Sequence, residues 1–353
     1  MAGLYFTSTM ALSGKSAICI ALALQFKAQG LNVGYMKPLG TVPVEVGGRL
    51  TDEDAVFVSR TLQIDDSLDT ISPVLLTPDV YDAVLKGMPL GLEDDIRQAY
   101  SRIAAGRDLV ILEATGTISG GFALGLSAGR IAEMLDVRAV HVLAYRPDLA
   151  TDNVMMVRSM VGDRLMGVIV NNVPPDAMER VKVTFGKFLS RNGMKLFGAL
   201  PTDKILNAIS VRELADVLDG EILCCREREG DLVEAFQVGA MNVDSALRYM
   251  MRVPNKAVIV GGDRADIQLA ALQTSTKALV LTGNLYPDSI ILSRATEVGV
   301  PVIVARMETM AAVKLVEPMM GRIRVSHPRQ VARMLDLVDH GVDLQALRQA
   351  AGI

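Results

Sequence analysis

The sequence predicts a three-layer α/β protein built on a parallel sheet, and three observations support this class. The chain has 353 residues, more than twice the ~150 residues usual for one domain, so we expect two domains. Short apolar runs rich in β-branched residues alternate with longer segments of helical period, which is the pattern of parallel βαβ units. Half of the residues are hydrophobic, yet no run approaches the ~18 uncharged apolar residues that a membrane span needs. We therefore expect a soluble protein with no membrane contact.

The first domain is expected to contain six strands joined by helices. The strands are the apolar runs 4–7, 33–37, 109–113, 139–144, 167–171 and 196–200. Helices are expected in the intervening segments, among them 15–29, 51–62 and 178–192. Gly30 and Gly193 follow two of these helices, where a left-handed C-cap residue would lie.

A second, smaller α/β series follows a pause in the pattern near Pro201. Ser210 and Glu213 have the spacing of a capping box, so a helix is expected to begin there. Strands are expected at 222–225, 257–260, 278–282 and 300–305, each followed by a helical stretch. The expected domains are thus 1–205 and 206–320, with 321–353 as a helical tail whose residues 328–351 form one or two amphipathic helices.

Composition narrows the class of ligand and the compartment. Lysine and arginine number 36 against 40 acidic residues, and only 4% of residues are aromatic, so nucleic acid is not an expected partner. Cys19, Cys224 and Cys225 cannot make a disulfide framework, and the N-terminus lacks a secretion signal, which predicts a cytoplasmic protein. The three histidines lack metal-ligand spacing and are interpreted as structural, namely His141, His327 and His340.

The strongest chemical signal is Ser13-Gly14-Lys15-Ser16, which directly follows the first strand and opens the first helix. This is the context of a phosphate-binding loop, in which backbone N–H groups from Thr9 to Ala17 surround phosphates, the lysine neutralises them and the serine binds Mg²⁺. The usual first glycine is replaced by Thr9. The alternative is a chance occurrence of the tripeptide at a helix start.

Further candidates follow the ends of other strands, where parallel sheets bind ligands. Lys37 ends the second expected strand, and Thr41 follows it. Lys37 would be a second cation near bound phosphate or a carboxylate, or an ordinary solvated lysine. Asp54 lies in an acidic helix start that the helix dipole favours in any case. Glu113 ends a very apolar strand beside the phosphate loop, where it would be a magnesium ligand or a water-orienting group, or else a capped or paired buried carboxylate. Asn171 would contact a purine edge or occupy a turn before two prolines.

Taken together and in order, six segments resemble dethiobiotin synthetase and its P-loop relatives. They are the stretch 33–41 (VGYMKPLGT), the GKS loop, Asp54-Ala55, Glu113, the GVIVNN stretch and Gly198-Ala199-Leu200-Pro201. The resemblance implies that Lys15 holds the phosphates of ATP and that Ser16, Asp54 and Glu113 surround Mg²⁺. It also implies that Lys37 lies between nucleotide and acceptor and that Asn171 contacts adenine.

Two segments depart from the synthetase pattern. Ser8-Thr9-Met10 replaces a glycine-threonine-aspartate start of the loop, and Ala114-Thr115-Gly116 replaces a glycine-rich stretch that approaches the diamine substrate. Nucleotide binding tolerates these changes, but they argue against dethiobiotin synthesis.

The second half resembles the DRTGG domain, which follows such a P-loop domain at the front of long phosphate acetyltransferases. The segments that carry this resemblance are Val238-Gly239-Ala240-Met241, the stretch 260–267 (VGGDRADI) and Leu281-Thr282-Gly283-Asn284. Asp263 is expected to cap the next helix, with Arg264 pairing with an acid or an anion. The acetyltransferase catalytic domain does not follow in this sequence, so we expect no acetyl transfer by this polypeptide.

Three functions remain open. The first is a regulatory or sensor protein that binds ATP and Mg²⁺, with slow hydrolysis and a protein partner at the DRTGG-like domain. The second is an ATP-dependent ligase that acts on an unidentified amine or carboxylate. The third is an interaction protein that has lost nucleotide binding. By the resemblance, we expect a homodimer or higher homo-oligomer.

Overall fold

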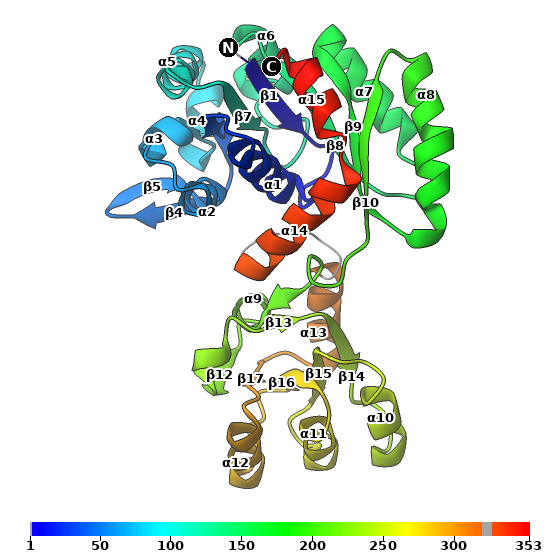
Figure 1. Cartoon of the computed structure of the whole chain (residues 1–353). Helices are drawn as coiled ribbons and strands as arrows, with labels where there is room; N and C mark the ends of the chain where they lie inside the picture. Colours follow the sequence, from blue (N-terminus) through cyan, green and yellow to red (C-terminus); the bar gives the residue numbers. More distant parts are fainter. Residues whose placement is uncertain (1, 320–326) are drawn as a thin grey trace. The chain divides into compact units, whose positions relative to one another are not determined.

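The computed structural model describes residues 2–319 and 327–353, which fall into two compact units (Figure 1). The first unit comprises residues up to Thr202 together with Pro328–Ile353, and the second comprises Asp203–His327. The chain thus leaves the first unit, forms the second, and returns. The sequence pattern marks the departure near Pro201 but does not show where the tail belongs.

The first unit is built on a six-stranded sheet of order β10-β9-β8-β1-β7-β2. Every neighbouring pair in it runs parallel, as predicted. The strands are β1 Ala2–Thr7, β2 Val33–Met36, β7 Leu109–Glu113, β8 Arg138–Ala144, β9 Leu165–Val173 and β10 Lys195–Pro201. Because the strands are parallel, the residues that follow β1, β2, β7 and β9 all lie at one edge of the sheet.

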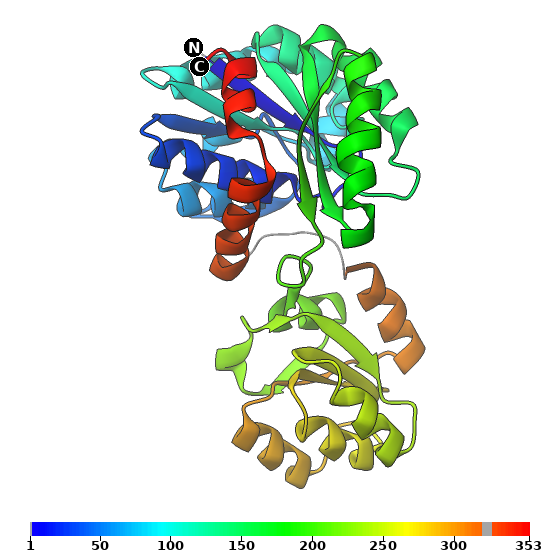
Figure 2. The same ribbon diagram turned by 45° about the vertical axis from the view of Figure 1, so that its right-hand side comes forward.

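Helices cover both faces of this sheet. One face packs against α5 Leu92–Ala104, α6 Ala128–Met134, α7 Thr151–Val161 and α8 Gly186–Arg191 through a continuous apolar core. The other face carries α1 Lys15–Ala28, which lies beside α14 Pro328–Gly341, while α15 Leu344–Ala351 contacts β1 and β10 (Figures 1 and 2). The class predicted from the sequence, a P-loop NTPase-type α/β fold with a helical C-terminal tail, is confirmed.

The tail belongs to the first unit through specific contacts. Gln25 Nε2 on α1 donates a hydrogen bond to Asp339 Oδ1 on α14 at 2.9 Å. The backbone N–H of Asp343 donates to the carbonyl of Phe197 on β10 at 2.8 Å. One or two amphipathic helices were predicted over 328–351, and the structure has two, whereas 321–326 lie outside the described residues.

Local structure differs from the prediction in two places. The helix expected from residue 51 begins at Glu53, because Thr51 and Asp52 belong to a hairpin of β4 Pro43–Val46 and β5 Arg49–Asp52. Residues 178–192 are not one α-helix, since a π-helix Arg180–Phe185 precedes α8. The remaining elements of this unit are short: β3 Leu39–Gly40 paired with β6 Val74–Leu75, α2 Glu53–Leu62, α3 Leu68–Ile71 and α4 Pro78–Leu85.

The second unit has a five-stranded sheet of order β12-β17-β16-β15-β14. Its strands are β12 Glu221–Cys224, β14 Ala235–Val238, β15 Lys256–Gly261, β16 Thr276–Thr282 and β17 Val302–Val304. Helices α10 Val243–Met250, α11 Ala265–Leu272 and α12 Ser289–Val298 pack on one face, and α9 Val211–Val217 and α13 Thr309–Val316 pack on the other. The capping box of Ser210 and Glu213 is present at the start of α9, as predicted.

The expectation that a helical stretch directly follows the strand at 222–225 is wrong. The strand expected at 222–225 is antiparallel to β17, and a short 3-10 turn and two strands follow it, β13 Leu232–Val233 and β14. The run 235–238 lacks the continuous apolar character of a central strand, because β14 is an edge strand and only partly buried.

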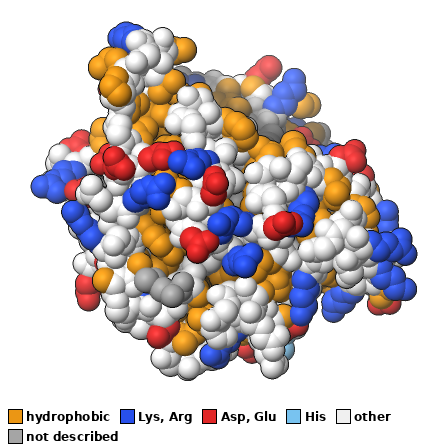
Figure 3. Space-filling view, turned by 90° about the horizontal axis from the view of Figure 1, so that it is seen from above, with side chains coloured by type: hydrophobic (Ala, Val, Ile, Leu, Met, Phe, Trp, Pro, Cys, Tyr) orange, Lys and Arg blue, Asp and Glu red, His pale blue; other side chains and the backbone are white. Residues whose placement is uncertain are grey.

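Nucleic-acid binding and membrane contact were not expected from the sequence, and two features concern them: the surface charges and the lengths of the helices. On the face seen in Figure 3, acidic and basic side chains are interspersed. None of the helices within residues 2–319 and 327–353 combines the length and the apolar character that crossing a membrane requires.

Candidate functional site: a phosphate-loop edge with two lysine-carboxylate clusters

The loop between β1 and α1 has the backbone of an anion-binding turn. Gly14 is the N-cap of α1 and has a left-handed conformation, with φ 86° and ψ 15°, which explains the need for glycine there. Leu12 is also left-handed, with φ 58°. The first turn of α1 contains no acidic residue, so the partial positive charge of the helix N-terminus is not neutralised from within the helix.

Polar groups around this loop hold it in place and leave one hydroxyl unused. Asn171 Nδ2 donates to the carbonyl of Ser13 at 3.0 Å, and Ser8 Oγ donates to the carbonyl of Gly116 at 3.3 Å. Ser13 Oγ is buried and has no hydrogen-bond partner. A buried unpaired hydroxyl in such a loop is what a phosphate oxygen would satisfy.

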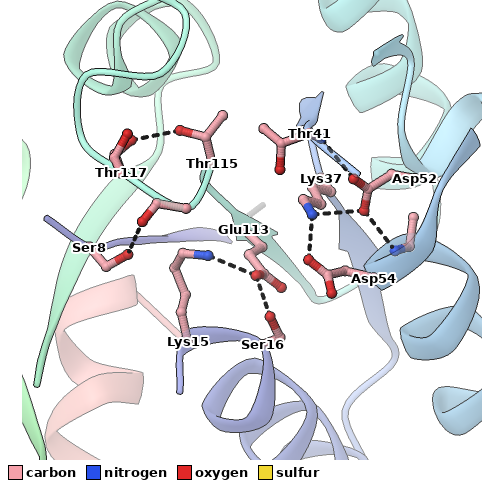
Figure 4. Close-up of polar contacts among 12 residues, drawn as sticks. Ser8, Lys15, Ser16, Lys37, Thr41, Asp52, Asp54, Glu113, Thr115 and Thr117 are labelled. Atoms are coloured by element: carbon pink, nitrogen blue, oxygen red, sulfur yellow. Dashed lines mark hydrogen bonds and ion pairs between the residues drawn. The ribbon is translucent and has the colours of Figure 1, made fainter. Parts of the chain in front are cut away.

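The first cluster is centred on Glu113, the last residue of β7. Its Oε1 lies 2.8 Å from Lys15 Nζ and accepts a hydrogen bond of 2.6 Å from Ser16 Oγ (Figure 4). Its Oε2 accepts a hydrogen bond of 2.8 Å from the hydroxyl of Tyr35 on β2. The pKa of Tyr35 is raised well above its ordinary value, mainly by burial and secondly by the charge of Glu113. The phenol therefore remains protonated and donates the hydrogen bond. Glu113 is therefore a paired carboxylate fully within the protein.

The second cluster is centred on Lys37, which follows β2 and has a side chain only 2% exposed. Its Nζ lies 2.7 Å from Asp52 Oδ1 and 2.6 Å from Asp54 Oδ2. Burial alone would lower the pKa of Lys37, but the carboxylates of Asp54, Glu113 and Asp52 outweigh burial and raise it. Figure 4 shows this cluster beside the first, so two cations and three carboxylates meet at the carboxyl edge of the sheet.

The structure thus brings together Lys15, Ser16, Glu113, Lys37 and Asp54 from four separate chain segments. Ser16 and Glu113 are in direct contact, whereas Asp54 contacts Lys37 instead. Within the described residues, no three histidine, cysteine or acidic side chains are grouped as a metal site of protein ligands alone would require.

Other predicted site residues have different placements. Asn171 is fully buried. Its Nδ2 donates to the loop carbonyl of Ser13, and its Oδ1 accepts from the N–H of Asn172 at 2.9 Å, while the expected adenine contact stays a prediction. Ala17 is buried in the first turn of α1, and Thr9 is partly exposed. Thr41 is exposed and lines a cavity of about 390 Å³, with Leu76, Tyr81, Thr115, Gly116, Thr117 and Gly120.

Two residues of these clusters were not among the sequence candidates. Asp52 is the N-cap of α2, and its Oδ2 accepts from the N–H groups of Thr41 and Val42 at 2.8 and 3.1 Å, so it fixes both Lys37 and the turn after it. Its position one residue before a helix with acidic first-turn residues was the available signal. Tyr35 gave no signal, because a tyrosine inside an apolar strand is expected in the core.

His141 agrees with its interpretation as a structural residue. Its Nδ1 lies 3.1 Å from Thr7 Oγ1 on the neighbouring strand. Complete burial lowers the pKa of His141 to about 4, so the ring is neutral at physiological pH.

In the second unit, the predicted cap is wrong. The N-cap of α11 is Arg264, and the side chain of Asp263 makes no cap there. The expected pairing of Arg264 with an acid is present: its Nε lies 3.0 Å from Oδ1 of Asp266, and both side chains are exposed. The geometry is that of a surface ion pair.

The family assignment follows from the extent of two domain models. An AAA domain model matches residues 2–210, and a DRTGG domain model matches 213–319. The chain belongs to the AAA domain family. Its first unit is a P-loop domain related to the dethiobiotin synthetases, and its second is a DRTGG domain, as the sequence motifs indicated.

Curated relatives match either nearly the whole chain or about half of it. The phosphate acetyltransferase of Pseudomonas aeruginosa is 26% identical over 366 residues, which cover 96% of this chain and 50% of that protein. The ATP-dependent dethiobiotin synthetase BioD of Methanocaldococcus jannaschii is 31% identical over 179 residues, which cover 48% of this chain and 78% of that protein. This AAA domain protein therefore spans about half the length of the phosphate acetyltransferases that it matches.

Among solved structures, the MinD cell division protein of Aquifex aeolicus is similar to this AAA domain protein with a TM-score of 0.37 and 14% identity. The match covers 57% of this chain and 83% of that one.

Proposed function

We propose that the first unit binds ATP with Mg²⁺ and that the chain acts as a nucleotide-responsive regulatory protein, with slow ATP hydrolysis. The observation that carries the proposal is the contact of Lys15 and Ser16 with Glu113 at the start of α1. In this arrangement the loop lysine neutralises a buried carboxylate. Phosphates that reach the loop would take Lys15 as their counter-ion and leave Glu113 without its cation.

The residues fit a magnesium ion that arrives with the nucleotide. Mg²⁺ prefers oxygen ligands and is usually held by one or two carboxylates together with substrate phosphates and water. Ser16, Glu113 and Asp54 supply one hydroxyl and two carboxylates at the same edge of the sheet. The ion would supply charge neutralisation for the phosphates, and the two lysines would hold the nucleotide and orient it.

The regulatory role rests on the union of this unit with a DRTGG domain. In the phosphate acetyltransferases that this chain resembles, the matched region is about half of the protein. We propose that the DRTGG domain passes the nucleotide state to a protein partner or to a second copy in a homo-oligomer. The expected compartment is the cytoplasm.

Isothermal titration with ATP and ADP, in Mg²⁺ and separately in EDTA, tests the binding proposal. Lys15→Ala is expected to weaken ATP binding about 10- to 100-fold, because a charged hydrogen bond is worth roughly 1.5–3 kcal/mol. Lys27→Ala, at the other end of α1, is the matched control and should bind as the wild type does. Absence of binding by the wild type, or equal binding by Lys15→Ala, would overturn the proposal.

A second candidate is an ATP-dependent ligase acting on an amine or a carboxylate. It is favoured by the cavity of about 390 Å³ beside the loop, whose lining includes the hydroxyl-bearing Thr41, Thr115 and Thr117. ADP release that rises only when one acceptor is added would support it. A screen of diamines and carboxylic acids with bicarbonate that gives no stimulation would exclude it.

A further inference from the structure

Tyr35 is the partner of Glu113 on the side away from the phosphate loop. In the parallel pairing of β2 with β7, Tyr35 lies opposite Ile111. Side chains two residues apart on a strand share a face, so Ile111 and Glu113 point to the same side, and Tyr35 is the diagonal neighbour of Glu113. Both Tyr35 and Glu113 are completely buried, and their oxygens are 2.8 Å apart.

The two oxygens of Glu113 therefore have different partners. Oε2 accepts from Tyr35, and Oε1 faces Lys15 and Ser16. Because the two oxygens belong to one rigid, planar carboxylate, a hydrogen bond that holds Oε2 also limits the direction of Oε1. The phenol thus turns Oε1 toward the loop.

We propose that Tyr35 is a positioning residue for the divalent cation that accompanies the nucleotide, a role that rests on the proposed function. In the nucleotide complex, Lys15 would bind the phosphates and Ser16 would bind the cation. Tyr35, the third hydrogen-bond donor to Glu113, would bind neither and would keep its contact with Oε2. It therefore keeps Oε1 directed at the cation after the other two contacts have changed.

This role predicts an effect on the metal rather than on the nucleotide itself. Partners that orient a metal ligand are typically worth 10- to 100-fold in metal affinity. Lys15 and the loop backbone bind the phosphates directly, and Tyr35 contacts neither. Loss of the Tyr35 hydroxyl should therefore leave metal-free ATP binding nearly unchanged.

The test compares Tyr35→Phe with Tyr5→Phe, which removes the hydroxyl of another buried strand tyrosine of the same sheet. ATP affinity is measured by calorimetry in EDTA, and Mn²⁺ affinity of the ATP-bound protein is measured by electron paramagnetic resonance. For Tyr35→Phe we expect about 10- to 100-fold weaker Mn²⁺ binding and an ATP affinity in EDTA within about twofold of the wild type. Tyr5→Phe should match the wild type in both.

The double variant Tyr35→Phe with Glu113→Gln separates positioning from a general loss of packing. If Tyr35 acts through Glu113, its removal should weaken Mn²⁺ binding little further in the Glu113→Gln background. Wild-type Mn²⁺ affinity in Tyr35→Phe, or an equal loss of ATP binding with and without metal, would overturn the positioning role. Failure of the wild type to bind ATP would instead overturn the proposed function and this role with it.

Discussion

Lys37 is held by two carboxylates that should differ greatly in their contribution to stability. Asp52 is completely buried, and three backbone N–H groups fix its carboxylate, whereas the side chain of Asp54 is 29% exposed. We predict that Lys37 and Asp52 form a structural pair and that the contact of Lys37 with Asp54 is readily exchanged. The perturbation is Lys37→Met, alone and combined with Asp52→Asn or Asp54→Asn.

The magnitudes follow from the geometry. Two charges separated by the 2.7 Å of the Lys37–Asp52 contact attract by about 6 kcal/mol at an effective dielectric constant of ~20. Desolvation offsets much of this, but removing one partner of a buried pair typically costs about 3–5 kcal/mol. We therefore expect Lys37→Met to lower the free energy of unfolding by about that amount. The coupling energy with Asp52 should be about 3 kcal/mol, against roughly 1 kcal/mol with the more exposed Asp54.

Unfolding in urea is monitored by hydrogen exchange and mass spectrometry, and peptides from β1, β7 and α2 report on the first unit. The exposed pair Arg49–Asp69, at 3.1 Å, is the control and should show a coupling below about 0.5 kcal/mol. A coupling of Lys37 with Asp54 that equals or exceeds its coupling with Asp52 would refute the reasoning. In that case Asp54 would be a fixed structural partner and a poor candidate for a magnesium ligand.

Three further predictions concern stability. Burial lowers the pKa of Lys256 to about 8, so the charge of this lysine destabilises the folded state fully below pH 8 and no longer does so above its ordinary pKa of 10.5. Lys256→Met should therefore raise the free energy of unfolding at pH 7 by about 1–3 kcal/mol after allowing for screening. Urea titrations in which this gain does not shrink between pH 8 and pH 10.5 would contradict the prediction. Because the pKa of His141 is lowered, the stability of the folded state should fall as the pH drops from 6.5 toward 4. His141→Gln should remove part of this pH dependence of the melting temperature. An unchanged pH dependence in His141→Gln would show that acid destabilises the protein through other groups alone. Ser210→Ala removes the capping box of α9 and should cost about 1 kcal/mol in the unfolding of the second unit, whereas Ser210→Asp should retain most of the stability.

Elements with a local signal were predicted well. The apolar runs, the GKS loop and the capping box depend on residues that are neighbours in sequence, so the sequence alone specifies them. The hairpin before α2 was missed because Thr51 and Asp52 also fit a helix start. There, pairing with residues 43–46 decided the outcome.

The direction of individual site side chains could not be predicted, because it depends on distant partners. Asn171 at a strand end looks the same in sequence whether its amide faces a ligand or the carbonyl of Ser13, which is 158 residues away. Tyr35 contacts Glu113 across 78 residues. Each contact requires the sheet order and register, which short sequence patterns do not encode.

The return of the chain from the second unit has a consequence for synthesis on the ribosome. Because α14 covers α1, one face of the nucleotide-binding unit is completed by residues made after the whole DRTGG domain. During translation, the middle of the chain can reach its final fold while apolar groups of α1 still await their cover. The helix that begins with Lys15 therefore leaves the ribosome before the DRTGG domain but is fully buried only after it.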